Sequence, residues 1–167
     1  MDEDILIRPL AEGDWDAIVE LEAGAYGEDG LSEGRDALRA RWRSSPGTCF
    51  VVECGGRFGG YLLALPYPLF QCPDLSRAEE RSFDSGNLHA HDLVIADGLR
   101  GRGLAARLLS HLADLAREQR FERISMVAVR GAHVLWARLG YREHPEVALP
   151  AGYGAQAVYM SMALQTA

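Results

Sequence analysis

The stretch that decides the fold is residues 91–109, which read HDLVIADGLRGRGLAARLL. An apolar segment typical of a strand leads into a turn rich in glycine and arginine, and an amphipathic helix is predicted directly after it. This order gathers free backbone N–H groups, the guanidinium groups of Arg100 and Arg102, and the positive end of a helix dipole in one small volume. Such a volume suits a phosphate group, so the stretch predicts a binding site for a phosphorylated cofactor.

The composition of the chain limits what else it binds. Its 167 residues, 48% of them hydrophobic, suffice for one domain with a core, which we expect to span residues 1–167. The net charge of −7 argues against a nucleic-acid partner, because binding to phosphate backbones needs a basic face. The acidic N-terminus and the lack of a long apolar run predict neither a signal peptide nor a membrane segment. Three cysteines without paired spacing favour reduced thiols, and we expect a cytoplasmic protein.

The periodicity of apolar residues and the positions of glycine and proline predict one mixed α/β sheet. The helix after the glycine turn places Leu104, Leu108, Leu112 and Leu115 on one face. Residues 66–88 contain three prolines and a charged run, and we expect a long surface loop there. The predicted strands lie at about 5–10, 49–54, 58–65, 88–96, 124–129, 141–149 and 157–164, and the predicted helices at about 14–27, 33–45, 104–118 and 131–139.

Three phosphate-binding motifs compete for the glycine turn. A Walker loop ends in Gly-Lys-Ser/Thr, whereas Gly103 here is followed by leucine, so that motif is excluded. Residues 101–106 fit the G-x-G-x-x-A fingerprint of dinucleotide-binding sheets. However, the chain after the turn is too short for a doubly wound sheet, and Arg130 rather than an acid ends the next predicted strand. The third motif is Arg/Gln-x-x-Gly-x-Gly/Ala, which Arg100, Gly103 and Ala105 satisfy.

At this third motif the chain resembles the GNAT superfamily of acetyl-CoA-dependent N-acetyltransferases, and the resemblance extends on both sides. Residues 7–9 and Asp14 resemble the opening strand and first helix cap of the family, and residues 60–63 resemble its third strand. Residues 135–141, LWARLGY, are similar to the motif of its closing helix. The resemblance therefore covers residues 5–164 in the right order.

The resemblance implies a fold and a cofactor. The fold is α/β (α+β), a single mixed and mostly antiparallel sheet of about seven strands with four helices, in which the fourth and fifth strands splay apart. In the family the pantetheine arm of acetyl-CoA lies in that gap, and its pyrophosphate lies on the glycine turn. Carried over to this chain, the implied cofactor-binding residues are Leu93, Val94, Ile95, Arg100, Gly101, Arg102, Gly103, Leu104, Ala105 and Trp136.

The implied reaction is direct attack of a primary amine on the thioester. Because an alkylamine with a pKa of about 10.4 is almost fully protonated at neutral pH, a base must remove a proton. The candidates are Asp92 and His91 on the fourth predicted strand and Glu22 on the first predicted helix, regions where the family places bases. Strand alternation predicts that His89 and His91 face one side of the sheet and Asp92 the other. Which of these faces carries the chemistry is left open.

The chain departs from the family at the proton donor for the departing thiolate. Trp136 stands where the family often has a tyrosine, and an indole N–H does not donate a proton at neutral pH. Two roles for Trp136 therefore remain, packing beside the pantetheine arm or in the core. Tyr141 is the tyrosine that we include among the catalytic candidates, with Tyr153 and Tyr159 as further possible acids.

No metal is expected, because His89 and His91 have the i,i+2 spacing of ligands but no third ligand is evident. We expect an acetyl-CoA-dependent N-acetyltransferase whose acceptor is a primary amine of a small molecule or a peptide. A homodimer is compatible with this expectation. The alternative is a non-catalytic acyl-CoA-binding or regulatory domain of the same fold, which the replaced tyrosine motivates.

Overall fold

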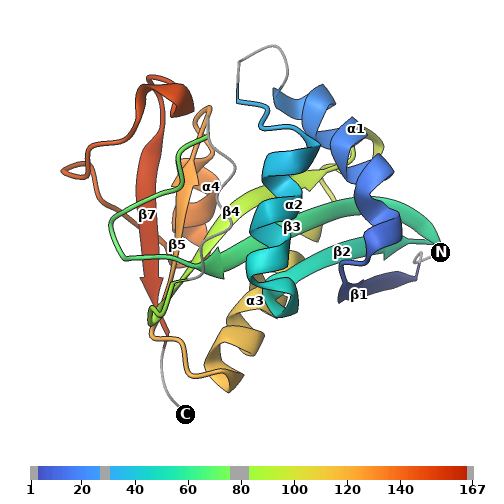
Figure 1. Cartoon of the computed structure of the whole chain (residues 1–167), viewed down its shortest axis with the longest axis horizontal. Helices are drawn as coiled ribbons and strands as arrows, with labels where there is room; N and C mark the ends of the chain where they lie inside the picture. The colour runs from blue at the N-terminus through green and yellow to red at the C-terminus, as the bar shows by residue number, and fades with distance from the viewer. Residues whose placement is uncertain (1–3, 27–30, 76–82, 165–167) are drawn as a thin grey trace.

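The computed structural model describes residues 4–26, 31–75 and 83–164, and in these residues the chain forms one sheet with helices on both faces (Figure 1). The strand order is β1-β2-β3-β4-β5-β7-β6. The strands are β1 (Ile5–Pro9), β2 (Cys49–Cys54), β3 (Arg57–Pro66), β4 (Asn87–Ile95), β5 (Arg123–Ala128), β6 (Arg142–Glu143) and β7 (Val158–Ala163). The helices are α1 (Trp15–Tyr26), α2 (Arg35–Ser44), α3 (Leu104–Glu118) and α4 (His133–Arg138). The predicted fold class is therefore confirmed.

The sheet is mixed because one connection differs from the others. Neighbouring strands run antiparallel except β4 and β5, which run parallel. A parallel pair needs a long crossover, and here α3 supplies it between β4 and β5. The glycine turn therefore lies at the carboxyl end of β4, directly before α3.

The helices bury their apolar faces against opposite sides of the sheet. Leu104, Leu108 and Leu112 of α3 are buried against one face, as the spacing predicts. Ile18 of α1 and Leu38 of α2 are buried against the other face. In Figure 1 α1 and α2 lie in front of the sheet and α3 behind it.

The pairing of β4 with β5 ends halfway along both strands. Residues 87–90 of β4 pair with residues 123–126 of β5, and then the two strands separate. Beyond that point Leu93 and Val94 pair with β3 alone, and Val127 pairs with β7 alone. Figure 1 shows the two ribbons diverging from their shared end. The described residues therefore contain the splay that the resemblance implies.

A β-bulge interrupts β4 at His91. Leu63 of β3 pairs with Asp92, and the next residue, Ala64, pairs with Ala90. His91 is therefore an extra residue on β4 with no partner opposite it on β3. A bulge of this kind turns the strand and changes where the following side chains point.

The bulge corrects the expected alternation of side chains along β4. Ala90 packs into the core on the α3 side, and the neighbouring His89 and His91 rings face away from it, 6.1 Å apart. After the extra residue the alternation is reversed, and Val94 packs into the core on the α1 side. Asp92 therefore shares a face with His91 instead of lying opposite it. Both side chains meet the end of α1.

Two further expectations differ from the structure at the chain's later half. The strand predicted at 141–149 is reduced to Arg142–Glu143, because Pro145 has no N–H to donate and the chain turns there, with Val147 N–H bonded to His144 C=O. The long loop expected at 66–88 is a coil segment in its described parts, while its residues 76–82 lie outside the described residues. Asp14 precedes α1 as predicted, and its carboxylate accepts bonds from Ala11 N–H and Arg8.

Candidate active site

The splay between β4 and β5 opens into a cavity of about 680 Å³. Its walls come from β4, the glycine turn, the start of α3, the end of β5 and α4. Nine of the ten residues that the resemblance implies for the cofactor line it, namely Leu93, Val94, Ile95, Arg100, Gly101, Gly103, Leu104, Ala105 and Trp136. Arg102 does not line it. The structure thus brings nearly the whole set to one place.

The glycine turn leaves the N-terminus of α3 open to this cavity. Gly103 is the N-cap in the left-handed conformation (φ 74°), and its lack of a side chain leaves the first N–H groups of the helix without a side-chain acceptor. A Cβ at Gly101 or Gly103 would meet no heavy atom within 4 Å, so space lies in front of the backbone. The first turn of α3 contains no acidic residue. These features together fit an anionic group of the size of a phosphate.

Arg100 stands beside this helix end. Its side chain is more than half exposed, contacts Asp97 (3.1 Å), and donates from Nε to the Ile95 carbonyl at 3.4 Å. An exposed ion pair of this kind contributes little to stability. The guanidinium is therefore free to exchange Asp97 for a stronger anionic partner.

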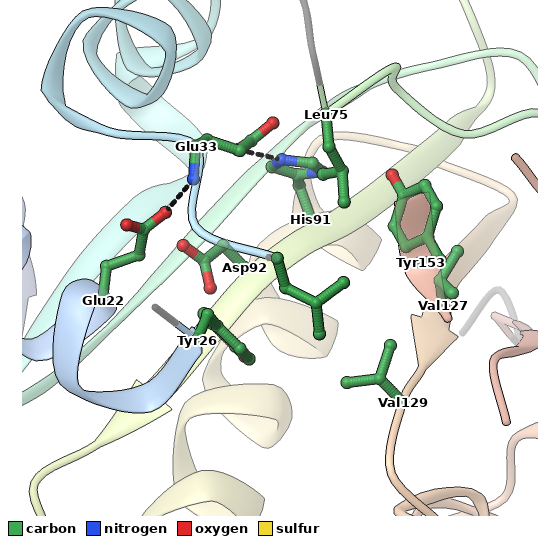
Figure 2. A pocket seen from close by; sticks show the side chains of 10 residues that line it. Glu22, Tyr26, Glu33, Leu75, His91, Asp92, Val127, Val129 and Tyr153 are labelled. Atoms are coloured by element: carbon green, nitrogen blue, oxygen red, sulfur yellow. Dashed lines mark hydrogen bonds and ion pairs between the residues drawn. The ribbon is translucent and has the colours of Figure 1, made fainter. Parts of the chain in front are cut away.

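A second, smaller cavity of about 50 Å³ adjoins the first (Figure 2). Figure 2 shows acidic side chains of Glu22, Glu33 and Asp92 on one side of it and Val127, Val129 and Tyr153 on the other. Its remaining lining residues are Tyr26, Leu31, Leu75 and His91. Tyr26, His91, Val127 and Val129 line both cavities, so the two spaces meet at these residues.

Glu33 forms the centre of the polar wall. One of its carboxylate oxygens lies 2.7 Å from His91 Nε2, and the other accepts a 2.7 Å bond from the Arg41 guanidinium. The side chains of all three residues are almost fully buried. Burial alone would raise the pKa of Glu33, but its attraction to His91 and Arg41 and their hydrogen bonds lower that pKa to about 2. Glu33 is therefore an anion at every working pH.

Glu22 fixes the loop that carries Glu33. Its carboxylate accepts a bond from the Glu33 N–H (2.7 Å) and a second, short one from the Ser32 hydroxyl. Glu22 is 1% exposed, so the two bonds satisfy a carboxylate that water hardly reaches. The candidate base from α1 is thus occupied in holding the loop.

Asp92 differs from Glu33 because its carboxylate forms no ion pair among the described residues. The Tyr61 hydroxyl donates to Asp92 Oδ2 at 2.7 Å, and this is the one bond to its carboxylate found among the described residues. Burial raises the pKa of Asp92, the Tyr61 bond opposes the rise, and the negative charges of Glu33 and Glu22 add to it, giving about 8. A cation that entered the small cavity would relieve this excess of negative charge.

Tyr26 stands at the junction of the two cavities on the α1 side. Its hydroxyl lies 3.5 Å from the Leu93 carbonyl, and the Arg130 guanidinium stacks over its ring at 5.4 Å from the centroid. Arg130 also donates to the Ala25 carbonyl at 2.6 Å, which links α1 to the residues that follow β5. Burial raises the pKa of Tyr26 well above its ordinary value, so the phenol keeps its proton.

The structure brings three of the four candidate catalytic residues together. Asp92, His91 and Glu22 line the small cavity, and Tyr153 joins them, with its hydroxyl bonded to the Pro73 carbonyl. Tyr141, the fourth candidate, is buried in the core on the α3 side and lines neither cavity. Tyr159 lines neither cavity, and its hydroxyl accepts a bond from the Phe70 N–H.

Three residues of the site were missed in the sequence, Glu33, Arg41 and Tyr26. Arg41 had a local signal, because it follows Ala37 and Leu38 at helical spacing and so belongs to the buried face of α2. Glu33 had none, since its neighbours are the polar residues of a loop. Tyr26 read as the last apolar residue of a helix, and nothing local distinguished it from a core position.

The described residues contain few other features that bear on a site. Within the described ranges no three His, Cys, Asp or Glu side chains are grouped so that they would hold a metal ion. None of the described helices is long and apolar enough to cross a membrane. Cys49, Cys54 and Cys72 are free thiols, of which the first two are buried.

A sequence model of the Acetyltransferase (GNAT) family matches residues 15–141. The chain therefore belongs to the GNAT family. Membership supports acyl-CoA-dependent N-acyltransfer as the general activity, with an acyl-CoA as co-substrate. None of the curated proteins matched the chain.

Solved structures agree with the family assignment at the level of fold. Ard1 from Thermoplasma volcanium superposes with a TM-score of 0.75 at 13% identity, over 96% of this chain and 98% of that one. A GphF GNAT-like decarboxylase in complex with isobutyryl-CoA superposes with a TM-score of 0.79 at 18% identity, over 96% of this chain and 100% of that one. The ribosomal-protein-S18-alanine N-acetyltransferase from Escherichia coli gives 0.64 at 15% identity, over 98% and 96%. Because these names cover different reactions, the likeness establishes the fold and not the acceptor.

Proposed function

We propose that this protein transfers the acetyl group of acetyl-CoA to a primary amine, which enters through the small acidic cavity. The observation that carries the proposal is the junction of the two cavities at Tyr26 and His91. The larger cavity suits the donor and the smaller one suits a cation. The reacting atoms meet where the two spaces join.

The larger cavity has the parts that acetyl-CoA requires. Its volume is within the range of small-molecule sites. The open N-terminus of α3 offers N–H groups and a positive dipole to the pyrophosphate, and Arg100 adds a charge-assisted contact. The unpaired side of β4 from Leu93 to Ile95 offers N–H and C=O groups to the amides of the pantetheine arm. Donors aimed at the thioester oxygen from this strand would stabilise the oxyanion.

The charge of the small cavity selects a cationic acceptor over an anionic one. Asp92 faces it without a cationic partner, and Glu33 and Glu22 add negative charge close by. A protonated amine would replace the missing cation, whereas a carboxylate substrate would meet three acids. The sign of this charge favours amine acetylation over the decarboxylation named for one structure of the same fold.

The protons balance with two groups at the junction. An ammonium R–NH₃⁺ gives one proton to a base, a role that we assign to His91, and the free amine then attacks the thioester carbon. The C–S bond breaks, and the CoA thiolate takes a proton from the Tyr26 hydroxyl, which regains one from the acylated nitrogen. The proton on His91 leaves to solvent, so the products are the amide, CoA–SH and one H⁺. Tyr26 thus supplies the acid that Trp136 cannot.

The competing possibility is that the chain binds acyl-CoA without turnover, which the tryptophan at position 136 motivates. A thiol-release assay separates the two. Acetyl-CoA is incubated with the protein and a panel of linear diamines, amino-acid amines and short peptides, and free CoA–SH is measured. We expect release that depends on the amine and that Tyr26→Phe lowers by about 10²-fold or more. Thermal stabilisation by acetyl-CoA without release for any amine would support the binding domain instead.

A further inference from the structure

Glu33 lies within hydrogen-bond distance of one nitrogen of the His91 imidazole. Glu33 Oε2 and His91 Nε2 are 2.7 Å apart, and their side chains are 3% and 1% exposed. The other ring nitrogen, Nδ1, is buried and has no hydrogen-bond partner in the described part of the chain. A buried polar atom without a partner is costly unless a ligand or substrate completes it.

We propose that Glu33 is a positioning residue that holds the proton of His91 on Nε2 and leaves Nδ1 as the proton acceptor for the amine. This inference rests on the proposed function. An ionised carboxylate only accepts hydrogen bonds, so the nitrogen facing Glu33 carries the proton. The neutral ring then has its lone pair on Nδ1. When Nδ1 takes a proton from the ammonium, Glu33 stabilises the imidazolium that forms.

The carboxylate is itself held in place from two sides. Arg41 on α2 donates to Glu33 from Nε and from its terminal nitrogen, and it also donates to the Asp74 carbonyl at 3.0 Å. Glu22 on α1 accepts the backbone N–H of Glu33 at 2.7 Å. Because α1 and α2 both hold it, Glu33 cannot turn away from His91 without breaking the bonds to Arg41 and Glu22. A preorganised partner of this kind is what a proton acceptor needs.

Every titratable or charged group around the imidazole enters the expected pH dependence. These groups are Glu22 and Tyr26 on α1, Glu33 on the loop, Arg41 on α2, Tyr61 on β3, His89 and Asp92 on β4, and Tyr153 beyond β6. Tyr26, Tyr61 and Tyr153 keep their protons because burial raises their pKa values, and burial lowers the pKa of His89 so that it stays neutral. Asp92 is the group among them that changes its protonation near neutral pH, because burial and the charges of Glu33 and Glu22 raise its pKa to about 8.

The direct test is the position of the proton on His91 in the wild-type protein. Nitrogen-15 NMR of the imidazole distinguishes the two neutral tautomers, and we expect the proton on Nε2 at pH 7 to 8. A proton on Nδ1 would overturn the inference. The measurement needs no turnover, so its result is independent of whether any amine drives CoA release.

Glu33→Gln tests the consequence for the reaction. The glutamine amide can donate to Nε2 and so favours the other tautomer. We expect kcat to fall by about 10²-fold or more, with KM for acetyl-CoA changed by less than about 2-fold. The acidic limb of the pH profile moves to lower pH, since the imidazolium has lost its counterion. An unchanged tautomer and an unchanged limb would contradict the positioning role.

Two further variants separate positioning from folding. Glu20→Gln, exposed on α1, is the matched control and should leave kcat, the pH profile and the tautomer as in the wild type. Arg41→Gln breaks the same buried cluster from its other side and should lower stability while the proton stays on Nε2. Loss of the Nε2 tautomer in a folded Arg41→Gln variant would show that Glu33 does not set the tautomer on its own and would contradict the inference. If Glu33→Gln does not fold, the wild-type spectrum alone decides.

Discussion

Asp92 is a buried acid whose pKa the fold raises far above its ordinary value. It is buried in a cluster with an excess of acids, and its pKa of about 8 lies far above the ordinary value of 3.8. Without a cation beside it, the carboxyl group keeps most of its proton at neutral pH and loses it only in alkaline solution. A residue kept in this state is typical of functional sites rather than of structural cores.

This state makes the stability of the ligand-free protein depend on pH. Because the pKa of Asp92 is higher in the folded than in the unfolded protein, its protonated carboxyl group contributes to the free energy of unfolding. This contribution is complete below about pH 4 and is lost as the pH rises to about 8. Asp92→Asn removes this dependence. We therefore expect the free energy of unfolding of the variant, compared with that of the wild type, to be roughly 1–3 kcal/mol more favourable at pH 9 than at pH 4. Urea unfolding at both pH values measures this difference.

The control for this experiment is Asp114→Asn, an exposed aspartate on α3. Its stability difference from the wild type should be the same at both pH values. If Asp92→Asn behaves like Asp114→Asn, the Asp92 carboxyl group does not titrate at a raised pKa.

The limits of sequence reasoning at this scale follow from distance along the chain. Asp92, His91 and Glu22 were candidates because they lie on predicted elements where the family places bases. Glu33 was missed, since its role depends on Arg41, eight residues away on α2, and on His91, which lies far along the chain on β4. Tyr141 was included because it follows a family motif, but its side chain turns to the α3 side. Local patterns do not show which side chains of different elements meet.

At the scale of elements, the close approach of β3 to β4 depends on one glycine. A Cβ built on Gly60 would lie 2.6 Å from the Val94 carbonyl oxygen, closer than real Cβ contacts. Gly60→Ala must therefore push β4 away where the proposed cofactor contacts begin. We expect a loss of roughly 1–3 kcal/mol in the free energy of unfolding and weaker acetyl-CoA binding by calorimetry.

Gly47→Ala is the matched control, because its Cβ would meet nothing within 4 Å and its φ is not left-handed. It should leave both stability and acetyl-CoA affinity close to the wild-type values. Equal behaviour of the two alanine variants would show that β4 accommodates the methyl group without moving.

The turn before α3 allows a charge test with the backbone strain held constant. Gly103 has a left-handed φ, which Asp and Asn tolerate about equally, and its Cβ position faces open space. Gly103→Asp places an anion at the proposed pyrophosphate site, whereas Gly103→Asn places a neutral group of the same size. We expect the Asp variant to bind acetyl-CoA at least about 10-fold more weakly than the Asn variant, a loss of about 1.4 kcal/mol. Equal affinities would remove the pyrophosphate from this turn.

On the scale of the whole molecule, the open side of the splay is where a ligand changes most. Residues 91–95 of β4 have no strand on the β5 side, so their outward N–H groups lack a sheet partner in the described structure. A bound pantetheine arm would supply partners. We therefore expect acetyl-CoA to slow hydrogen exchange of amides in residues 91–105 and to leave β1 and β2 unchanged.

Thermal denaturation measures the same binding globally. Acetyl-CoA at about 100 times its Kd should stabilise the protein by about 2.7 kcal/mol, a Tm increase of roughly 5–10 °C. NADH is the control ligand, because the rejected dinucleotide interpretation predicts stabilisation by NADH and none by acetyl-CoA. Stabilisation by NADH alone would reverse the assignment of the large cavity.

The fold as a whole was predictable because its signals are sequential. A strand, a glycine turn and an amphipathic helix follow one another in residues 91–109, and the flanking elements occur in the family's order. The last hairpin was not predictable to the same degree, since the apolar pattern of 141–149 overrode Pro145, where the chain turns after two strand residues. Patterns of hydrophobicity place elements well and their ends poorly.

The extra residue at His91 also determines which side chains of β4 line the small cavity. Because the bulge turns His91 and Asp92 to the same face, these two neighbouring side chains both line the small cavity, whereas Leu93 and Ile95 pack toward the α3 side. Substitutions at position 92 would therefore change the small cavity without touching the lining of the larger one. Deleting a single residue at the bulge would exchange the faces of the sheet toward which the following side chains of β4 point.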